Sequence, residues 1–394
     1  MPYFDHAATT LPRPEVLQAM WPYLTERFGN AASVHERGAA AADAIARARA
    51  VLAELTGFSP ADVVFTSGGT EADNLGIVGL ALANPRGKHL ISAKTEHEAV
   101  LQSIAWLERV HGFETSWVEL LPDGSMTPEA LRAALRPDST LVSLMLVNNE
   151  IGTVNPITEL AAVAHEAGAL MHCDAVQAAG WFDLRGLGVD ALAISGHKIG
   201  APQGIGAALI RSSLPLEPTV WGGGQQHGRR SGTENVAGAV ALATALALAE
   251  RDRLAGASER IAALRDRLID GVLALAPTAR LTGPAISRSL SEGGAGIETQ
   301  RSVASRAPHI ASFVFERING ETLLIELERH GVVCSSGSAC AAGSTDPSHV
   351  LIALGMAAEL AHTSVRFSLG HDSTETEVDQ ALTALEMVLA KLAS

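Results

Sequence analysis

The chain has 394 residues, of which 47% are hydrophobic and 18% are charged, a composition typical of a globular protein rather than a disordered one. Its formal net charge of −14 argues against a nucleic acid or an anionic membrane surface as the main partner. The longest uncharged segment, Val236–Ala249, is too short to span a bilayer, and the first residues lack the basic and apolar regions of a secretory signal, so we expect a cytoplasmic protein.

Short apolar segments alternate with helical stretches between Asp62 and about Ile210. The candidate strands are Val63–Phe65, His89–Ser92, Thr115–Val118, Leu141–Val147, Leu170–Asp174, Ala191–Ser195 and Ala207–Ile210. Several are apolar throughout, which is typical of strands buried on both faces, and helical patterns such as Glu71–Ala83 and Pro156–Ala167 lie between them. This alternation predicts an α/β fold with a mostly parallel sheet, which binds ligands beyond the carboxyl ends of its strands.

The sequence changes character after Thr233. In chain order we expect a long Ala- and Leu-rich helix, an exposed loop, a strand, a helix, the start of a strand and a final helix with one apolar face. These segments are Val236–Leu275, Ala285–Ala307, Ile310–Phe315, Glu321–His330, Val332–Val333 and about Val378–Leu392. The mixture predicts a smaller α+β domain.

The first motif that indicates a possible chemical role joins a strand to a helix at Gly68–Glu71. Gly68 and Gly69 allow backbone N–H groups to approach an anion closely, Thr70 adds a hydroxyl, and a helix N-terminus favours negative charge. The pattern matches neither the Walker nor the dinucleotide-binding motif. An anion site and an ordinary strand–helix turn capped by Thr70 are both open at this point.

Asp174 ends a predicted buried strand, and Gln177 follows three residues later. A carboxylate at the carboxyl end of a strand can hold the N–H of a pyridinium ring and so make the ring an electron sink. The alternative interpretation, which this motif alone favours, is an aspartate that caps the next helix.

Lysine is rare in this chain, which has only Lys88, Lys94, Lys198 and Lys391. Lys198 follows an apolar strand among small residues, where lost solvation lowers an amine pKa as Schiff-base chemistry requires, and Ser195 and His197 could bind a phosphate. Lys88 and Lys94 fit the alternative of a solvated loop lysine. We therefore single out Lys198 as the reactive amine.

The three cysteines are too few and too widely spaced for a disulfide framework or a zinc knuckle, so we expect reduced thiols. Cys340 lies in a run of small residues typical of an accessible loop, which suits a nucleophilic thiol. Cys173 and Cys334 adjoin apolar segments and fit packed positions better.

Two further segments carry side chains that are candidates for binding an anion. Arg366 lies within the apolar run 365–369, where it is a candidate for a substrate carboxylate or for a structural ion pair. The Gly-rich segment Gly222–Glu234 carries several donors, including Thr233, and is alternatively a solvated turn.

Taken together, these segments resemble the cysteine desulfurases, pyridoxal-phosphate enzymes of the aspartate-aminotransferase fold in the class V group. Ten motifs in the same order carry the resemblance over nearly the whole chain. They are Phe4–Thr10, Phe65–Glu71, Glu96–His97, Val147–Glu150, Asp174–Gln177, Gly196–Lys198, Arg230–Asn235, Ser335–Cys340, Pro347–Leu351 and Arg366–Gly370. The form Ser-Ser-Gly-Ser-Ala-Cys is similar to the subgroup with the longer cysteine loop, which supplies sulfur for iron–sulfur clusters and thiolated products.

The resemblance implies a role for each motif residue. The implied cofactor site consists of Lys198, which holds pyridoxal phosphate covalently, with Gly69, Thr70, His97, Asp174, Gln177, Ser195 and His197, and Thr233 from a second subunit. His97 stacks on the ring and assists catalysis, Asn149 and Arg366 hold the substrate carboxylate, and Cys340 is the nucleophile that takes sulfur from L-cysteine and leaves alanine. No metal is implied.

The resemblance also implies a homodimer, a sulfur acceptor or iron–sulfur scaffold protein as partner, and two domains. The large domain, with a seven-stranded sheet, would span 15–255, and the small one would combine 1–14 with 256–394. Gln203, Gln226 and His227 depart from common family residues, and the polar loop 285–307 is longer than expected.

Two alternative hypotheses for the function remain. The first is another enzyme of the same class, either a selenocysteine lyase or an aminotransferase, and the second is a non-catalytic sulfur-relay protein. Cys340 argues against the aminotransferase, and intact Lys198, Asp174 and Cys340 argue against the relay.

Overall fold

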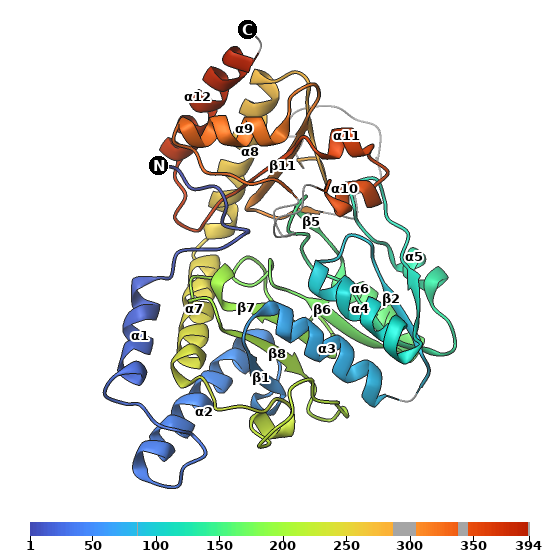
Figure 1. Ribbon diagram of the computed structural model, residues 1–394, viewed down its shortest axis with the longest axis vertical. Helices are drawn as coiled ribbons and strands as arrows, with labels where there is room; N and C mark the ends of the chain where they lie inside the picture. Colours follow the sequence, from blue (N-terminus) through green and yellow to red (C-terminus); the bar gives the residue numbers. More distant parts are fainter. Residues whose placement is uncertain (85, 287–304, 338–345, 393–394) are drawn as a thin grey trace, which may run out of the picture.

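The computed structural model describes residues 1–84, 86–286, 305–337 and 346–392, and within them seven strands join into one sheet (Figure 1). In spatial order they are β1 (Val63–Thr66), β8 (Gly206–Ile210), β7 (Ala191–Ser195), β6 (Leu170–Asp174), β4 (Ser139–Ser143), β2 (His89–Ser92) and β3 (Glu114–Trp117). Neighbours from β7 to β3 are parallel, and β8 runs antiparallel to both β7 and β1. The predicted α/β fold with a mostly parallel sheet is confirmed, although residues 144–147 lie beyond the end of β4.

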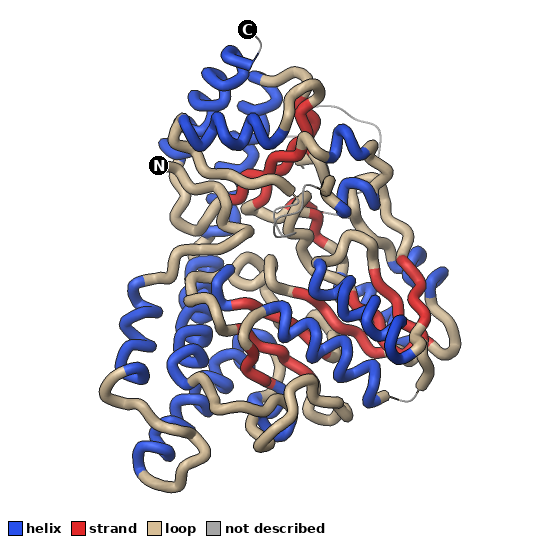
Figure 2. Tube along the Cα trace, in the orientation of Figure 1, coloured by secondary structure: helices blue, strands red, loops and turns tan. Residues whose placement is uncertain are grey.

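Helices cover both faces of this sheet (Figure 2). On one face are α3 (Gly69–Ala83) and α4 (Glu98–His111), and on the other are α1 (Pro14–Leu24), α2 (Glu36–Thr56), α5 (Pro128–Ala134), α6 (Ile157–Glu166) and α7 (Val236–Leu254). Successive strand residues alternate between the two cores, since Val64 packs with α3 while Val63 and Phe65 pack with α2. Burial on both faces explains why the strand sequences are apolar throughout.

A single helix over 236–275 was expected, and this expectation is wrong, because α7 ends at Leu254 and α8 (Ala257–Leu275) begins after Gly256. Gly256 has φ +88°, a left-handed conformation that glycine adopts without steric cost and that a continuous helix does not contain. The break separates α7, packed on the large sheet, from α8, packed in a second core.

The second core surrounds an antiparallel sheet that has three strands within the described residues. Its order is β12 (Ser364–Ser368), β11 (Ile310–Phe315) and β9 (Ala279–Leu281), and its helices are α8, α9 (Gly320–Arg329) and α12 (Glu375–Leu392). Two short helices, α10 (His349–Ala353) and α11 (Ala358–Ala361), lie beside it. The predicted strand, helix and final helix are confirmed here, whereas the strand expected at Val332–Val333 is reduced to one bridge between Tyr3 and Val333.

The N-terminal residues cross to this second part of the molecule (Figure 1). The Phe4 N–H donates to the Val333 carbonyl (2.7 Å), and the Phe4 carbonyl accepts from the Ser368 N–H (2.7 Å). The Phe4 ring is fully buried in the second core. The following residues, Ala7–Thr10, thereby pass close to the end of β7.

The loop expected over 285–307 is described only at its ends, and 287–304 lie outside the described residues. At its far end, β10 (Ser305–Arg306) pairs with β5 (Thr153–Val154). Ser305 is exposed as expected, whereas Arg306 is buried and donates to the carbonyls of Thr282 and Pro284. None of the helices in the described ranges is both long and apolar enough to cross a membrane.

Candidate active site

A cavity of about 220 Å³ opens where β6 and β7 end and α3 begins. Its lining residues are Ala7, Gly69, Thr70, Asp73, His97, Val147, Asn149, Asp174, Val176, Gln177, Ser195, His197 and Lys198. Nine of the twelve candidate site residues line this cavity. The other three do not line it: Thr233 is exposed, Arg366 is buried and contacts the backbone of Asn149, and Cys340 falls outside the described residues.

Lys198 ends a short 3₁₀ turn, Gly196–Lys198, directly after β7. Its Nζ donates to the carbonyls of Ala7 (2.5 Å) and Ala8 (2.7 Å) on the N-terminal segment. The same segment fixes the turn from the other side, because Thr10 Oγ1 donates to the His197 carbonyl (2.8 Å) and accepts from the Gly200 N–H (2.8 Å). The amine is therefore held at the cavity by backbone oxygens rather than in open solvent.

Asp174 is the last residue of β6, and its Oδ1 accepts from the Val176 N–H (2.8 Å). In the fully described stretch 175–190 no helix follows, so the carboxylate closes a turn instead of capping a helix. Burial raises the pKa of Asp174, while the neighbouring His97 and Lys198 act to lower it. A cationic N–H placed beside this carboxylate would keep it ionised.

One end of the cavity lies at the N-terminus of α3. A Cβ on Gly69 would lie 2.8 Å from Val176 Cγ2 and 3.3 Å from Ser195 Cβ, so no side chain fits at that position. Burial, and secondarily the charge of Lys198, lowers the pKa of His197 to about 4, which makes its ring neutral at pH 7. Thr70, Ser195 and the first amides of α3 therefore form a cradle of neutral donors suited to a phosphate.

His97 caps α4, because its Nδ1 accepts the Ala99 N–H (3.1 Å). This contact leaves Nδ1 without a proton and fixes the orientation of the ring at the cavity wall. The preceding residue, Glu96, is fully buried and accepts the Met145 N–H (2.8 Å), and burial raises its pKa well above the usual range.

Arg366 is completely buried in β12. Its Nη1 donates to the Asn149 carbonyl (2.8 Å) and its Nη2 donates to Asp5 Oδ1 (2.9 Å). Its Nε has no hydrogen-bond partner among the described residues. Both interpretations of Arg366 thus have support, since it forms a structural ion pair and also keeps one buried donor for an anion.

Sequence reasoning missed two features of the cavity. The Ala7 carbonyl accepts from both Lys198 and Gln177, but a backbone oxygen leaves no signature in the residue type. Asp73 is a buried acid on α3 whose Oδ1 lies 3.5 Å from His172 Nε2, and burial raises its pKa well above the usual range. An acid just before the apolar part of α3 was the signal that could have identified it.

Comparison with known proteins agrees with this geometry. Residues 2–381 match the family described as aminotransferase class-V. The chain is 42% identical to the cysteine desulfurase IscS of Methanosarcina thermophila, over 99% of this chain and 92% of that protein. It is also 42% identical to a cysteine desulfurase of Cereibacter sphaeroides, over 99% of this chain and 96% of that protein.

The chain belongs to the cysteine desulfurases of the class-V aminotransferase family. Solved structures agree: a NifS-like protein superposes with a TM-score of 0.87 at 32% identity, over 99% of both chains. SspA in complex with cysteine superposes with a TM-score of 0.75 at 30% identity, over 94% of this chain and 99% of that chain. Enzymes of this family depend on pyridoxal phosphate, and the cavity suits that group, because it combines an amine, a buried carboxylate, an imidazole and neutral donors at a helix N-terminus.

Proposed function

We propose that this cysteine desulfurase takes sulfur from L-cysteine, releases L-alanine and forms a persulfide on Cys340. The observation that carries the proposal is the convergence of Lys198, Asp174, His97 and the α3 N-terminus on one cavity. The solved structure of SspA in complex with cysteine supports this substrate. A sulfur acceptor, such as an iron–sulfur scaffold protein, would then take the persulfide sulfur in the cytoplasm.

We further propose that pyridoxal phosphate is held by Lys198 Nζ, with its phosphate at Gly69, Thr70, Ser195 and His197. When bound, this cofactor supplies an electron sink for the electrons released at the substrate α-carbon. The Asp174 carboxylate would face the ring nitrogen, and Gln177 would donate to the phenolic oxygen. Thr233 is exposed in the single chain, which suits a contact across a homodimer.

The remaining steps use groups of the chain. Lys198 Nζ would take the proton from the substrate α-carbon as a general base, and the resulting ammonium would serve as a general acid. The thiolate of Cys340 forms a bond with the cysteine sulfur, the carbon–sulfur bond breaks, and the carbon keeps the electron pair and takes up a proton. The sum is L-cysteine and a thiol giving L-alanine and a persulfide, so no external oxidant is required.

Arg366 and Asn149 would hold the substrate carboxylate. The Arg366 side chain has no exposure to solvent and its Nε has no partner in the described part of the chain, so a carboxylate would satisfy a buried donor.

Substrate comparison tests the proposed reaction. With L-cysteine we expect alanine in amounts equal to the transferred sulfur, without any 2-oxo acid in the assay. Turnover of L-selenocysteine with none of L-cysteine would instead identify a selenocysteine lyase. Amino transfer to a 2-oxo acid would identify an aminotransferase, and both results would contradict the proposal.

Replacing Asp174 with Asn keeps the shape of the side chain and removes its charge. We expect alanine formation to slow by roughly 10²- to 10³-fold, because the charge that stabilises the electron sink is lost, while cofactor attachment at Lys198 persists. The rate of alanine formation under saturating L-cysteine measures this effect. Asp183→Asn is the matched control, since Asp183 lies at the surface in an ion pair with Arg185 and should leave the rate unchanged.

A further inference from the structure

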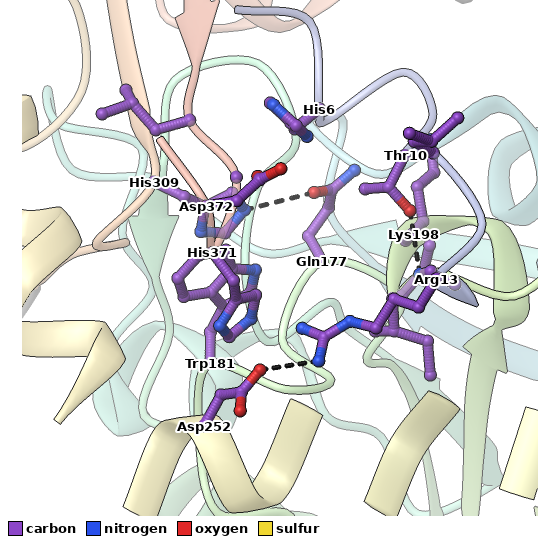
Figure 3. Close-up of a pocket in the computed structure, with 16 residues that line it drawn as sticks. His6, Thr10, Arg13, Gln177, Trp181, Lys198, Asp252, His309, His371 and Asp372 are labelled. Carbon is purple, nitrogen blue, oxygen red and sulfur yellow. Dashed lines mark hydrogen bonds and ion pairs between the residues drawn. The ribbon is translucent and has the colours of Figure 1, made fainter. Parts of the chain in front are cut away.

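A second cavity, of about 250 Å³, adjoins the first and shares Val176, Gln177 and Lys198 with it (Figure 3). Its wall contains a stack of three rings from distant parts of the chain. The Trp181 ring is stacked on the His309 ring, with centroids 4.5 Å apart and an interplanar angle of 6°, and is also stacked on the His371 ring, at 3.9 Å and 16°. Stacking on Trp181 holds the plane of the His309 ring.

His309 directly precedes β11, and its backbone is fixed because its carbonyl accepts the Leu369 N–H (2.9 Å). Its side chain is 2% exposed. Burial, with smaller contributions from His371, Arg265 and other positive groups, lowers the pKa of His309 well below 6.5. The ring is therefore neutral and carries a single N–H.

The hydrogen bonds of Gln177 determine where that N–H lies. Gln177 Nε2 donates to the Ala7 carbonyl (2.9 Å), so the amide nitrogen faces the N-terminal segment and Oε1 faces away from it. His309 Nε2 lies 3.4 Å from Oε1, and a carbonyl oxygen only accepts. The proton is therefore on Nε2, which agrees with the absence of any partner for His309 Nδ1 within the described ranges.

We propose that His309 is a positioning residue for Gln177, whose Oε1 it holds so that the amide nitrogen faces the cofactor cavity as a donor. The proposal rests on the proposed function, in which Gln177 donates to the phenolic oxygen of pyridoxal phosphate. A rotated amide would place Oε1 against the Ala7 carbonyl, a repulsive contact, and its NH₂ against His309 Nε2. The imidazole could accept from this NH₂ only with its proton moved to Nδ1, which is buried and has no partner within the described ranges. His309 acts through Gln177 and touches no reacting atom.

The test is the dissociation constant of pyridoxal phosphate, measured by titrating the cofactor into the apoprotein and following its visible absorption. His309→Leu removes the donor and should weaken binding about fivefold to tenfold and shift the visible band. His309→Gln can place an amide N–H near the position of the imidazole Nε2, and should retain the wild-type affinity and spectrum. If the His309→Leu variant does not fold, His309→Met, an unbranched apolar replacement, takes its place, and we expect the same weakening of cofactor binding.

A double-mutant cycle separates positioning from general packing. Because His309 acts through Gln177, His309→Leu should cause no further loss of affinity in a Gln177→Leu background. Wild-type affinity for both apolar variants at His309, or an equal loss with and without Gln177, would overturn the proposal. A wild-type protein that binds no pyridoxal phosphate would instead refute the proposed function, and the two failures are therefore distinguishable.

Discussion

Replacing Lys198 with Ala should lower the rate of alanine formation by at least about a thousandfold, because one change removes both the covalent anchor of the cofactor and the proton-transferring amine. Lys198 is the one lysine among the residues that line the described cavity, so no neighbouring amine can substitute for it. The purified variant should also lack the visible absorption of covalently attached pyridoxal phosphate. Absorption spectra and alanine assays on the same preparation measure both effects.

Lys88→Ala provides the matched control for this change. Lys88 is also a lysine that donates to a backbone carbonyl, that of His111 (2.7 Å), but it lies at the surface and away from the cavity. Its replacement should leave the absorption and the rate unchanged. A Lys198→Ala protein that retained the visible band would move the anchor elsewhere in the chain and contradict the assignment.

Replacing Cys340 with Ser should abolish sulfur transfer while cofactor binding persists, because a hydroxyl at this position cannot form a persulfide. We expect the rate of alanine formation to fall by about 10³-fold or more, a change measured at saturating L-cysteine. The other two cysteines are poor substitutes, since burial raises the pKa of both Cys173 and Cys334 and keeps them as thiols at neutral pH.

Cys334→Ser is the control for the Cys340 variant, because Cys334 lies six residues earlier in the same segment. It should transfer sulfur at the parental rate. Loss of transfer in the Cys334 variant with retention in the Cys340 variant would show that the nucleophile was assigned to the wrong thiol.

Much of the fold could be predicted because burial on both faces makes parallel strands apolar throughout, as in Ala191–Ser195. The predictions failed where a single backbone conformation or a pairing partner decided the outcome. Gly256 breaks an otherwise continuous Ala- and Leu-rich helix by adopting a positive φ. Within the described residues, the segment 332–333 forms one isolated bridge, between Tyr3 and Val333, rather than a strand. The division into domains at residues 14 and 255 stays a prediction.

The nine candidate residues that line the cavity could be found from the sequence because each belongs to a short motif, and the resemblance then assembled the motifs. Contacts made by the backbone or across the fold left no such pattern. The Ala7 carbonyl accepts a hydrogen bond from Gln177, which lies 170 residues away in the sequence. His309 contacts the same glutamine at a sequence separation of 132 residues. Such pairs are created by packing of the N-terminal segment and the start of β11 around the turn that follows β6, so the structure was needed to find them.

The central claim is that Cys340 receives sulfur from L-cysteine. The most direct measurement is the intact mass of the purified holoprotein after brief exposure to L-cysteine without reductant, followed by peptide mapping. We predict a gain of one sulfur atom on the peptide that contains Cys340, and no gain on the peptides of Cys173 and Cys334. A protein that keeps its cofactor and gains no sulfur on Cys340 would contradict the mechanism.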